Sequence, residues 1–193
     1  MSINTKALVL GGGGAKGSYQ IGVFRGLREV GWQPGIVTGT SVGSLNGAFL
    51  VMDRLEEGER LWCTLDIHGV LETPKGKTPE ELRGFLLQVL RSGGLNIDPL
   101  GVTIEDALDE DRMRASSIRY GLVMTEMNTL KSHQYTLEEI PRGRLKEYMM
   151  ASSACFPALR PQEIDGVRYI DGGWSDNIPM ALAARMGASE LLA

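Results

Sequence analysis

The strongest constraint on the fold is a pair of short apolar runs, each followed at once by a glycine-rich turn and then by a helical pattern. Residues 7–10 lead into a turn at 11–17, and residues 36–38 lead into a turn at 39–43. Between the two units, residues 18–30 carry apolar side chains at helical spacing. A strand, a helix and a second strand form a βαβ unit, which requires a parallel sheet. We therefore expect an α/β fold with three layers, α/β/α, around a mainly parallel central sheet.

The second turn holds a serine between two glycines, Gly39-Thr40-Ser41-Val42-Gly43, in the pattern G-x-S-x-G. This pattern is typical of a sharp strand-to-helix elbow that exposes a nucleophile. The elbow needs Gly39 and Gly43, because the serine backbone is strained and a neighbouring Cβ would clash with the adjoining strand or helix. Ser41 is therefore the candidate nucleophile.

The composition indicates one domain and argues against one class of partner. With 193 residues and 42% hydrophobic content, the chain can bury one sizeable core, so we expect a single domain over residues 1–193. Twenty Lys+Arg against 24 Asp+Glu give a net charge of -4 without a dense basic run, which argues against nucleic acid. The N-terminal apolar run is too short for a signal peptide or a membrane span, so the expected compartment is the cytoplasm.

Residues 54–114 read as an irregular helical region that contains one well-marked helix. Thr78 is its expected N-cap, Pro79 fits the first helical position, and Glu81 completes a capping box. An apolar stripe follows, formed by Leu82, Phe85, Leu86, Val89 and Leu90. Such a stripe usually packs on the core, and the alternative is a lid or an interfacial face that meets lipid.

The second half of the chain predicts a mixture of strands and helices. Residues 120–127 and 131–137 are expected to pair as strands, and Ile164-Asp165-Gly166-Val167 is a hairpin signal that leads into Asp171. The other expected elements are a helix at 142–154, a last helix at 179–186 closed by Gly187, and the start of a strand at 190–193. A chain that ends within a strand is expected of a truncated or very compact member of its class.

The first glycine turn has three interpretations. Gly12, Gly14 and Gly17 satisfy G-x-G-x-x-G, but the acidic residue that a dinucleotide site needs at the end of the second strand is missing. A P-loop is disfavoured because Lys16 follows alanine and is followed by glycine, so the G-K-[ST] ending is absent. What remains is a run of backbone N–H groups that suits an anion. Such donors form oxyanion holes, each worth about 3 kcal/mol in the transition state.

The general base is harder to find. The histidines of the chain are His68 and His133, and neither follows a convincing acid as the serine, acid, histidine order of an α/β-hydrolase requires. The alternative base is a carboxylate that acts directly on the serine. Asp171 is the acid in the most unusual setting, at a strand end before Gly172 and Gly173. An aspartate at such a position can also simply form a turn.

No metal or cofactor is expected, because no His/Asp/Glu cluster has ligand spacing. Cys63 and Cys155 lie far apart in apolar settings without a C-x-x-C or zinc pattern. We expect both to be buried free thiols.

Four blocks of the chain, 12–17 (GGGAKG), 39–43 (GTSVG), 151–157 (ASSACFP) and 171–179 (DGGWSDNIP), resemble in order the blocks of the patatin-like phospholipase family. The resemblance implies a lipid acyl hydrolase with a dyad of Ser41 and Asp171. It also implies an oxyanion hole from the Gly12, Gly13 and Gly14 amides, supported by Lys16, Gly17, Gly39, Gly43, Gly172 and Gly173. Family members often have arginine where this chain has Lys16, which keeps the charge but loses the planar fork.

The implied partner is a lipid or fatty-acyl ester, with contact to a membrane surface. Residues 54–114 match no fixed pattern of the family, so the substrate preference is left open. Two alternatives to a phospholipase A-type esterase stay open as well. One is a short-chain esterase or thioesterase with the same site, and the other is a catalytically silent module that binds an anion.

Overall fold

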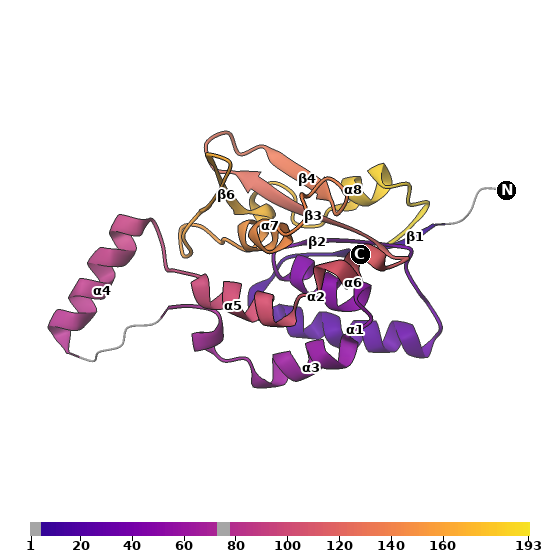
Figure 1. The fold of residues 1–193 in the computed structure, drawn as a ribbon, viewed down its shortest axis with the longest axis horizontal. Coiled ribbons are helices and arrows are strands. Elements are labelled where there is room, and N and C mark those ends of the chain that lie inside the picture. Colours follow the sequence, from indigo (N-terminus) through magenta and orange to yellow (C-terminus); the bar gives the residue numbers. More distant parts are fainter. Residues whose placement is uncertain (1–4, 73–77) are drawn as a thin grey trace.

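The computed structural model describes residues 5–72 and 78–193 (Figure 1). Their centre is a seven-stranded sheet with the order β5-β6-β3-β2-β1-β7, and β4 pairs with β3 outside this path. Strands β7, β1, β2 and β3 are parallel, whereas β4 and β6 join β3, and β5 joins β6, in antiparallel pairs. The strands are β1 Lys6–Leu10, β2 Ile36–Thr40, β3 Arg119–Glu126, β4 Ser132–Thr136, β5 Gln162–Ile164, β6 Val167–Asp171 and β7 Glu190–Leu192.

Helices flank this sheet, which confirms the predicted α/β fold with its mostly parallel sheet. The helices are α1 Ser18–Glu29, α2 Val42–Val51, α3 Leu55–Thr64, α4 Pro79–Ser92, α5 Asp98–Ala107, α6 Glu110–Ala115, α7 Leu145–Ser152 and α8 Met180–Arg185, with 3-10 turns η1 Gly14–Gly17, η2 Ile67–Gly69 and η3 Gly172–Trp174. Because side chains alternate along a strand, Leu8 and Leu10 of β1 enter the large core beside α1 and α2. Ala7 and Val9 enter a smaller core under α8, on the opposite face (Figure 1).

Strand β3 carries two other strands along one of its edges. β2 pairs with its first part, up to Thr40 opposite Val123, and β6 pairs with the part that follows, where Asp171 lies opposite Met124. β4 occupies the other edge. Because β6 runs antiparallel to β3 while β2 runs parallel to it, the carboxyl-terminal ends of β2 and β6 face each other. This register brings residue 41 and Asp171 to the same point of the sheet.

Most predicted elements are present, and two helix starts differ. The expected helix at 142–154 begins only at Leu145, because Gly143 has a positive φ of 81° and cannot continue a right-handed helix. The last helix begins at Met180, because Pro179 has a ψ of 61°, outside the helical region, and is the N-cap. The predicted hairpin at 164–167 is confirmed, with Asp165 and Gly166 both at positive φ.

Helix α4 has the predicted caps but not the predicted packing. Thr78 Oγ1 accepts a hydrogen bond from the Glu81 amide, the Glu81 carboxylate accepts one from the Thr78 amide, and Gly93 closes the helix in the left-handed region. The expectation that its apolar stripe packs on the core is wrong. No residue of α4 is buried, and the helix projects away from the body at the left of Figure 1. Periodicity showed that one face is apolar, but it carries no information on what covers that face.

The expectation of buried thiols is also wrong, because Cys63 and Cys155 are both exposed. Cys63 lies next to Trp62 on α3, where one helical step turns a side chain from the packed face toward solvent. Cys155 lies just after α7, at the rim of a cavity. None of the described helices combines the length and apolar content needed to cross a bilayer.

Candidate active site

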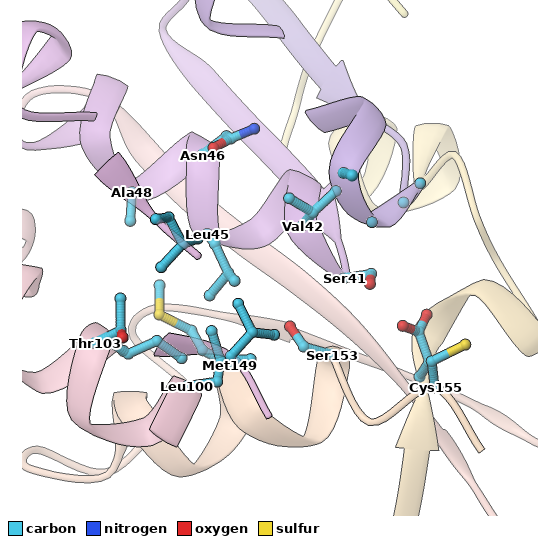
Figure 2. A pocket seen from close by; sticks show the side chains of 18 of the residues that line it. Ser41, Val42, Leu45, Asn46, Ala48, Leu100, Thr103, Met149, Ser153 and Cys155 are labelled. Atoms are coloured by element: carbon cyan, nitrogen blue, oxygen red, sulfur yellow. The ribbon is translucent and has the colours of Figure 1, made fainter. Parts of the chain in front are cut away.

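Ser41 forms the sharp turn between β2 and α2. Its backbone has φ 54° and ψ -130°, a conformation that side chains rarely adopt and that costs on the order of 1–3 kcal/mol. A Cβ at Gly39 would run into the backbone of Gly43, and one at Gly43 would run into the Leu10 carbonyl. These contacts confirm the predicted need for glycine on both sides of the elbow. The turn leaves the Ser41 side chain facing a cavity (Figure 2).

Asp171 ends β6 on the other side of the same junction. The residue is only 7% exposed, and its Oδ1 accepts a hydrogen bond of 2.7 Å from the Gly173 amide. Burial raises the pKa of this carboxyl above its usual value, while hydrogen bonds from the Ser41 side chain and the Gly173 amide oppose the rise. A Cβ at Gly172 would meet the Val123 carbonyl, so glycine is required for η3 to turn directly off the strand. The arrangement gives one buried carboxylate that faces a serine hydroxyl.

The first glycine turn lies against this pair. A Cβ on Gly12 would come within 3.0 Å of Ser41 Cβ and 2.7 Å of Asn177 Oδ1, so the loop and the elbow are in close contact. The Gly12 amide donates to Asn177 Oδ1 at 3.1 Å. Within the described residues, no hydrogen bond engages the amides of Gly13 and Gly14, and both residues line the same cavity as Ser41. The amides of Gly13 and Gly14 are therefore available to an oxyanion, whereas the amide of Gly12, which was also expected as a donor, is engaged by Asn177.

Among the other supporting residues expected from the sequence, Gly17 and Gly173 lie at the site and Lys16 does not line the cavity. Gly17 allows the first turn to pack against α2, since a Cβ there would lie 2.5 Å from Val42 Cγ2. Gly173 lines the cavity beside Asp171. Lys16, in contrast, is exposed and does not line the cavity.

A cavity of about 990 Å³ extends from the Ser41 and Asp171 side chains along α2. Figure 2 shows Ser41, Ser153 and Cys155 at one end, and Leu45, Leu100 and Met149 farther along. Both Val42 and Met52, at the two ends of α2, line the cavity. Its apolar wall is formed by side chains of α2, α3, α5 and α7, among them Phe49, Leu61, Ile104 and Met149. The cavity thus joins a polar end to a long apolar section.

Neither histidine lines this cavity. His133 lies on β4, where its Nε2 is 3.1 Å from Glu126 Oε2 and its ring stacks with Tyr135. His68 lies in η2, next to the cavity-lining Ile67. In the described parts of the chain, no group of three or more His, Cys, Asp or Glu is placed to hold a metal ion.

The sequence interpretation missed three residues of the site. Ser152 Oγ accepts a hydrogen bond from the Ser41 amide at 2.9 Å and donates one to the Val123 carbonyl at 2.7 Å. Asn177 holds the Gly12 amide, as described above. Ser153 lines the cavity with a buried Oγ that has no hydrogen-bond partner. Ser152 and Ser153 lie in the block ASSACFP, and Asn177 lies in the block DGGWSDNIP. A polar side chain within one of these blocks was therefore the signal that could have identified them.

Residues 8–184 match the family model described as patatin-like phospholipase. The chain is 29% identical over 192 residues to patatin-like phospholipase domain-containing protein 7 of Mus musculus, and 30% identical over 198 residues to patatin-like phospholipase domain-containing protein 6 of Homo sapiens. Each match covers 98% of this chain and 13% of the relative. The chain therefore spans about an eighth of the length of these relatives.

Two further comparisons involve bacterial proteins. An NTE family protein of Mycobacterium bovis is 29% identical over 188 residues, which cover 97% of this chain and 48% of that protein. The crystal structure of VipD from Legionella pneumophila superposes with a TM-score of 0.62 at 18% identity, over 92% of this chain and 47% of VipD. At this identity the likeness shows the fold alone.

Proposed function

The chain belongs to the patatin-like phospholipase family, and on that premise we propose that it hydrolyses a carboxylic ester of a lipid through a covalent acyl-serine on Ser41. The observation that carries the proposal is a serine on a strained elbow that faces a buried carboxylate, Asp171, at the end of an apolar cavity. Residues with a strained backbone cluster at active sites, where the strain is part of the mechanism. The chemistry proposed needs no metal.

In the acylation step, Asp171 accepts the proton of the Ser41 hydroxyl while Oγ attacks the ester carbonyl carbon. The carbonyl oxygen becomes an oxyanion, and the Gly13 and Gly14 amides donate hydrogen bonds to it. When the tetrahedral intermediate collapses, the bond to the leaving oxygen breaks and Asp171 returns the proton to that oxygen. The products are an acyl-serine and an alcohol.

Deacylation uses the same groups in reverse. Asp171 takes a proton from a water molecule, whose oxygen attacks the acyl carbonyl carbon, and the same two amides stabilise the second oxyanion. Collapse breaks the bond to Ser41 Oγ, which recovers the proton from Asp171. Burial supports both steps, because a carboxyl with a raised pKa is a stronger base once it is ionised.

The cavity favours a long acyl chain over a short one. Its apolar section follows the ten residues of α2, a length of about 15 Å. An extended carbon chain advances by less than one bond length of ~1.5 Å per carbon, so about ten or more carbons fit along it. A short-chain esterase or thioesterase would leave most of this apolar surface in contact with water.

A chain-length series tests both candidates. The specificity constant kcat/KM would be measured for p-nitrophenyl esters with acyl chains of two to sixteen carbons. Ser41→Ala is the control for background hydrolysis. The proposal predicts a rise in kcat/KM up to about ten carbons or more, since each buried methylene contributes about 0.8 kcal/mol. A maximum at two to four carbons would favour the short-chain esterase instead.

A further inference from the structure

The apolar stripe of α4 is the largest exposed apolar feature on a single described helix. Leu82, Leu86 and Leu90 lie four residues apart, so they share one face, and they are 40%, 60% and 77% exposed. Leu87 beside them is 44% exposed. Helix α4 makes no extensive contact with any other described element, and Figure 1 shows it apart from the sheet. A set of leucines this exposed indicates an interaction surface.

The helix is specified by its own sequence and not by packing. The capping box at Thr78 and Glu81 closes one end, and Gly93 closes the other with a φ of 76°. These caps provide hydrogen-bond partners for backbone N–H and C=O groups at the helix ends, which have no partner within the helix. Helix α4 is therefore an ordered element whose apolar face is not used by the fold.

The base of α4 is fixed to the wall of the catalytic cavity. The Glu72 amide donates to the Asn96 carbonyl, which joins the segments before and after the helix. Leu95 exchanges backbone hydrogen bonds with residues 158 and 160, on either side of the cavity-lining Leu159. On the other stem, Ile67 lines the cavity and is 54% exposed. The segments before and after α4 are thus both joined to the cavity wall.

A lipid surface is the partner that fits these features. An acyl chain must move from a bilayer into an apolar cavity, and an apolar helix whose base joins the cavity wall can hold that wall close to the bilayer, so that the acyl chain has little exposure to water. The helix has two acidic residues, Glu80 and Glu81, and two basic ones, Arg83 and Arg91, so it offers no charge preference for anionic lipid. Attachment should depend on leucine burial and should vary little with salt.

We propose that α4 is a membrane-docking helix that seats Leu82, Leu86 and Leu90 in the interface of a neutral bilayer and places the cavity at the lipid surface. The proposal rests on the proposed function for its choice of substrate. Docking itself is independent of the chemistry. It can therefore be measured separately from turnover.

The test compares two double variants that add the same charge to α4. Leu86→Glu with Leu90→Glu places two carboxylates on the apolar stripe. The matched control, Gly84→Glu with Gln88→Glu, places them on the opposite face, where a Cβ at Gly84 meets nothing within 4 Å. All four substitutions introduce a good helix former, and circular dichroism would check that the helix content is kept.

Binding would be measured by co-sedimentation with phosphatidylcholine vesicles, and turnover with a soluble p-nitrophenyl ester and with phospholipid in the same vesicles. The stripe variant should bind vesicles and hydrolyse vesicle lipid about tenfold less well or worse, because two buried leucines are lost. Its rate on the soluble ester should stay within about twofold of the unmodified chain, as should every rate of the control variant.

The outcomes separate the two proposals. An unmodified chain that hydrolyses the soluble ester but does not bind vesicles overturns the docking helix and leaves the proposed function intact. A chain that binds vesicles through the stripe but hydrolyses no ester supports docking and contradicts the function. Equal binding by the two variants, or self-association that disappears only in the stripe variant without vesicle binding, also overturns the docking helix.

Discussion

The Ser41 amide donates a hydrogen bond of 2.9 Å to Ser152 Oγ, which ties the elbow after β2 to the last turn of α7. Ser152 Oγ donates in turn to the Val123 carbonyl on β3 at 2.7 Å. One hydroxyl thus satisfies two backbone groups, one in the elbow after β2 and one on β3, at a residue with no exposed surface. The neighbouring Ser153 has the opposite character, because its buried Oγ has no partner.

This pair of serines gives a matched prediction. Ser152→Ala leaves a partly buried N–H and a buried carbonyl unpaired and should lower the free energy of unfolding by about 2 kcal/mol. Ser153→Ala removes an unsatisfied hydroxyl and should change it by less than about 0.5 kcal/mol or raise it. Urea denaturation of the two variants checks this. A larger loss in Ser153→Ala than in Ser152→Ala would contradict the hydrogen-bond network.

The glycine turn gives a second matched pair. A Cβ at Gly13 meets nothing closer than Lys16 Cβ at 3.6 Å, so Gly13→Val should fold, and it should lower kcat about 10²-fold by disturbing the oxyanion donors. The crowded residue is Gly12, so Gly12→Ala should lose stability by displacing Asn177 or Ser41. Thermal unfolding and initial rates measure both effects. A fully active Gly13→Val would mean that the donors lie elsewhere.

The raised pKa of Asp171 predicts an acid limb in the pH profile. As pH falls through this pKa, the carboxylate is protonated and can no longer accept the Ser41 proton, so kcat should fall at a pH above the usual aspartate value. Asp171→Asn should be nearly inactive. His68→Ala and His133→Ala should keep most of the rate and the same limb, because neither histidine lines the cavity. If a histidine variant stayed folded but lost the acid limb of the pH profile, the site would be a triad that includes this histidine and not a dyad.

The same pKa makes a prediction about stability. Burial disfavours the ionised Asp171, so the folded chain carries a penalty at pH values above the unfolded pKa, and the penalty is relieved as pH falls through the raised folded pKa. Asp171→Asn has no such charge. At neutral pH it should therefore have a Tm equal to or above that of the unmodified chain, and this advantage should shrink on acidification. A Tm advantage that grew toward acid pH would mean that the folded pKa is lowered instead.

The parts of the fold that local patterns determine were predictable. The glycine turns, the βαβ unit and the caps of α4 depend on neighbouring residues, and Gly39 and Gly43 have the close contacts that the elbow pattern requires. The approach of Asp171 to Ser41 depends on strand register along β3, which links residues far apart in the chain. The sequence suggested this pair only through the position of Asp171 at a strand end before two glycines, the lack of a suitably placed histidine, and family resemblance.

Three features lay beyond local patterns. The exposure of α4 depends on the absence of a packing partner, which periodicity does not report. The exposure of Cys155 depends on where the chain turns after α7. The roles of Ser152 and Asn177 depend on backbone groups brought to them by other strands and loops. Each is a consequence of long-range geometry.

The most direct test of the central claim is to trap the acyl-enzyme. The chain would be mixed with a long-chain p-nitrophenyl ester, quenched in acid within the first turnover, and digested for peptide mass mapping. We predict the mass of one acyl group on the peptide that contains Ser41, and no acylated peptide in Ser41→Ala. An acyl group on any other residue, or ester hydrolysis that persists in Ser41→Ala, would contradict the account.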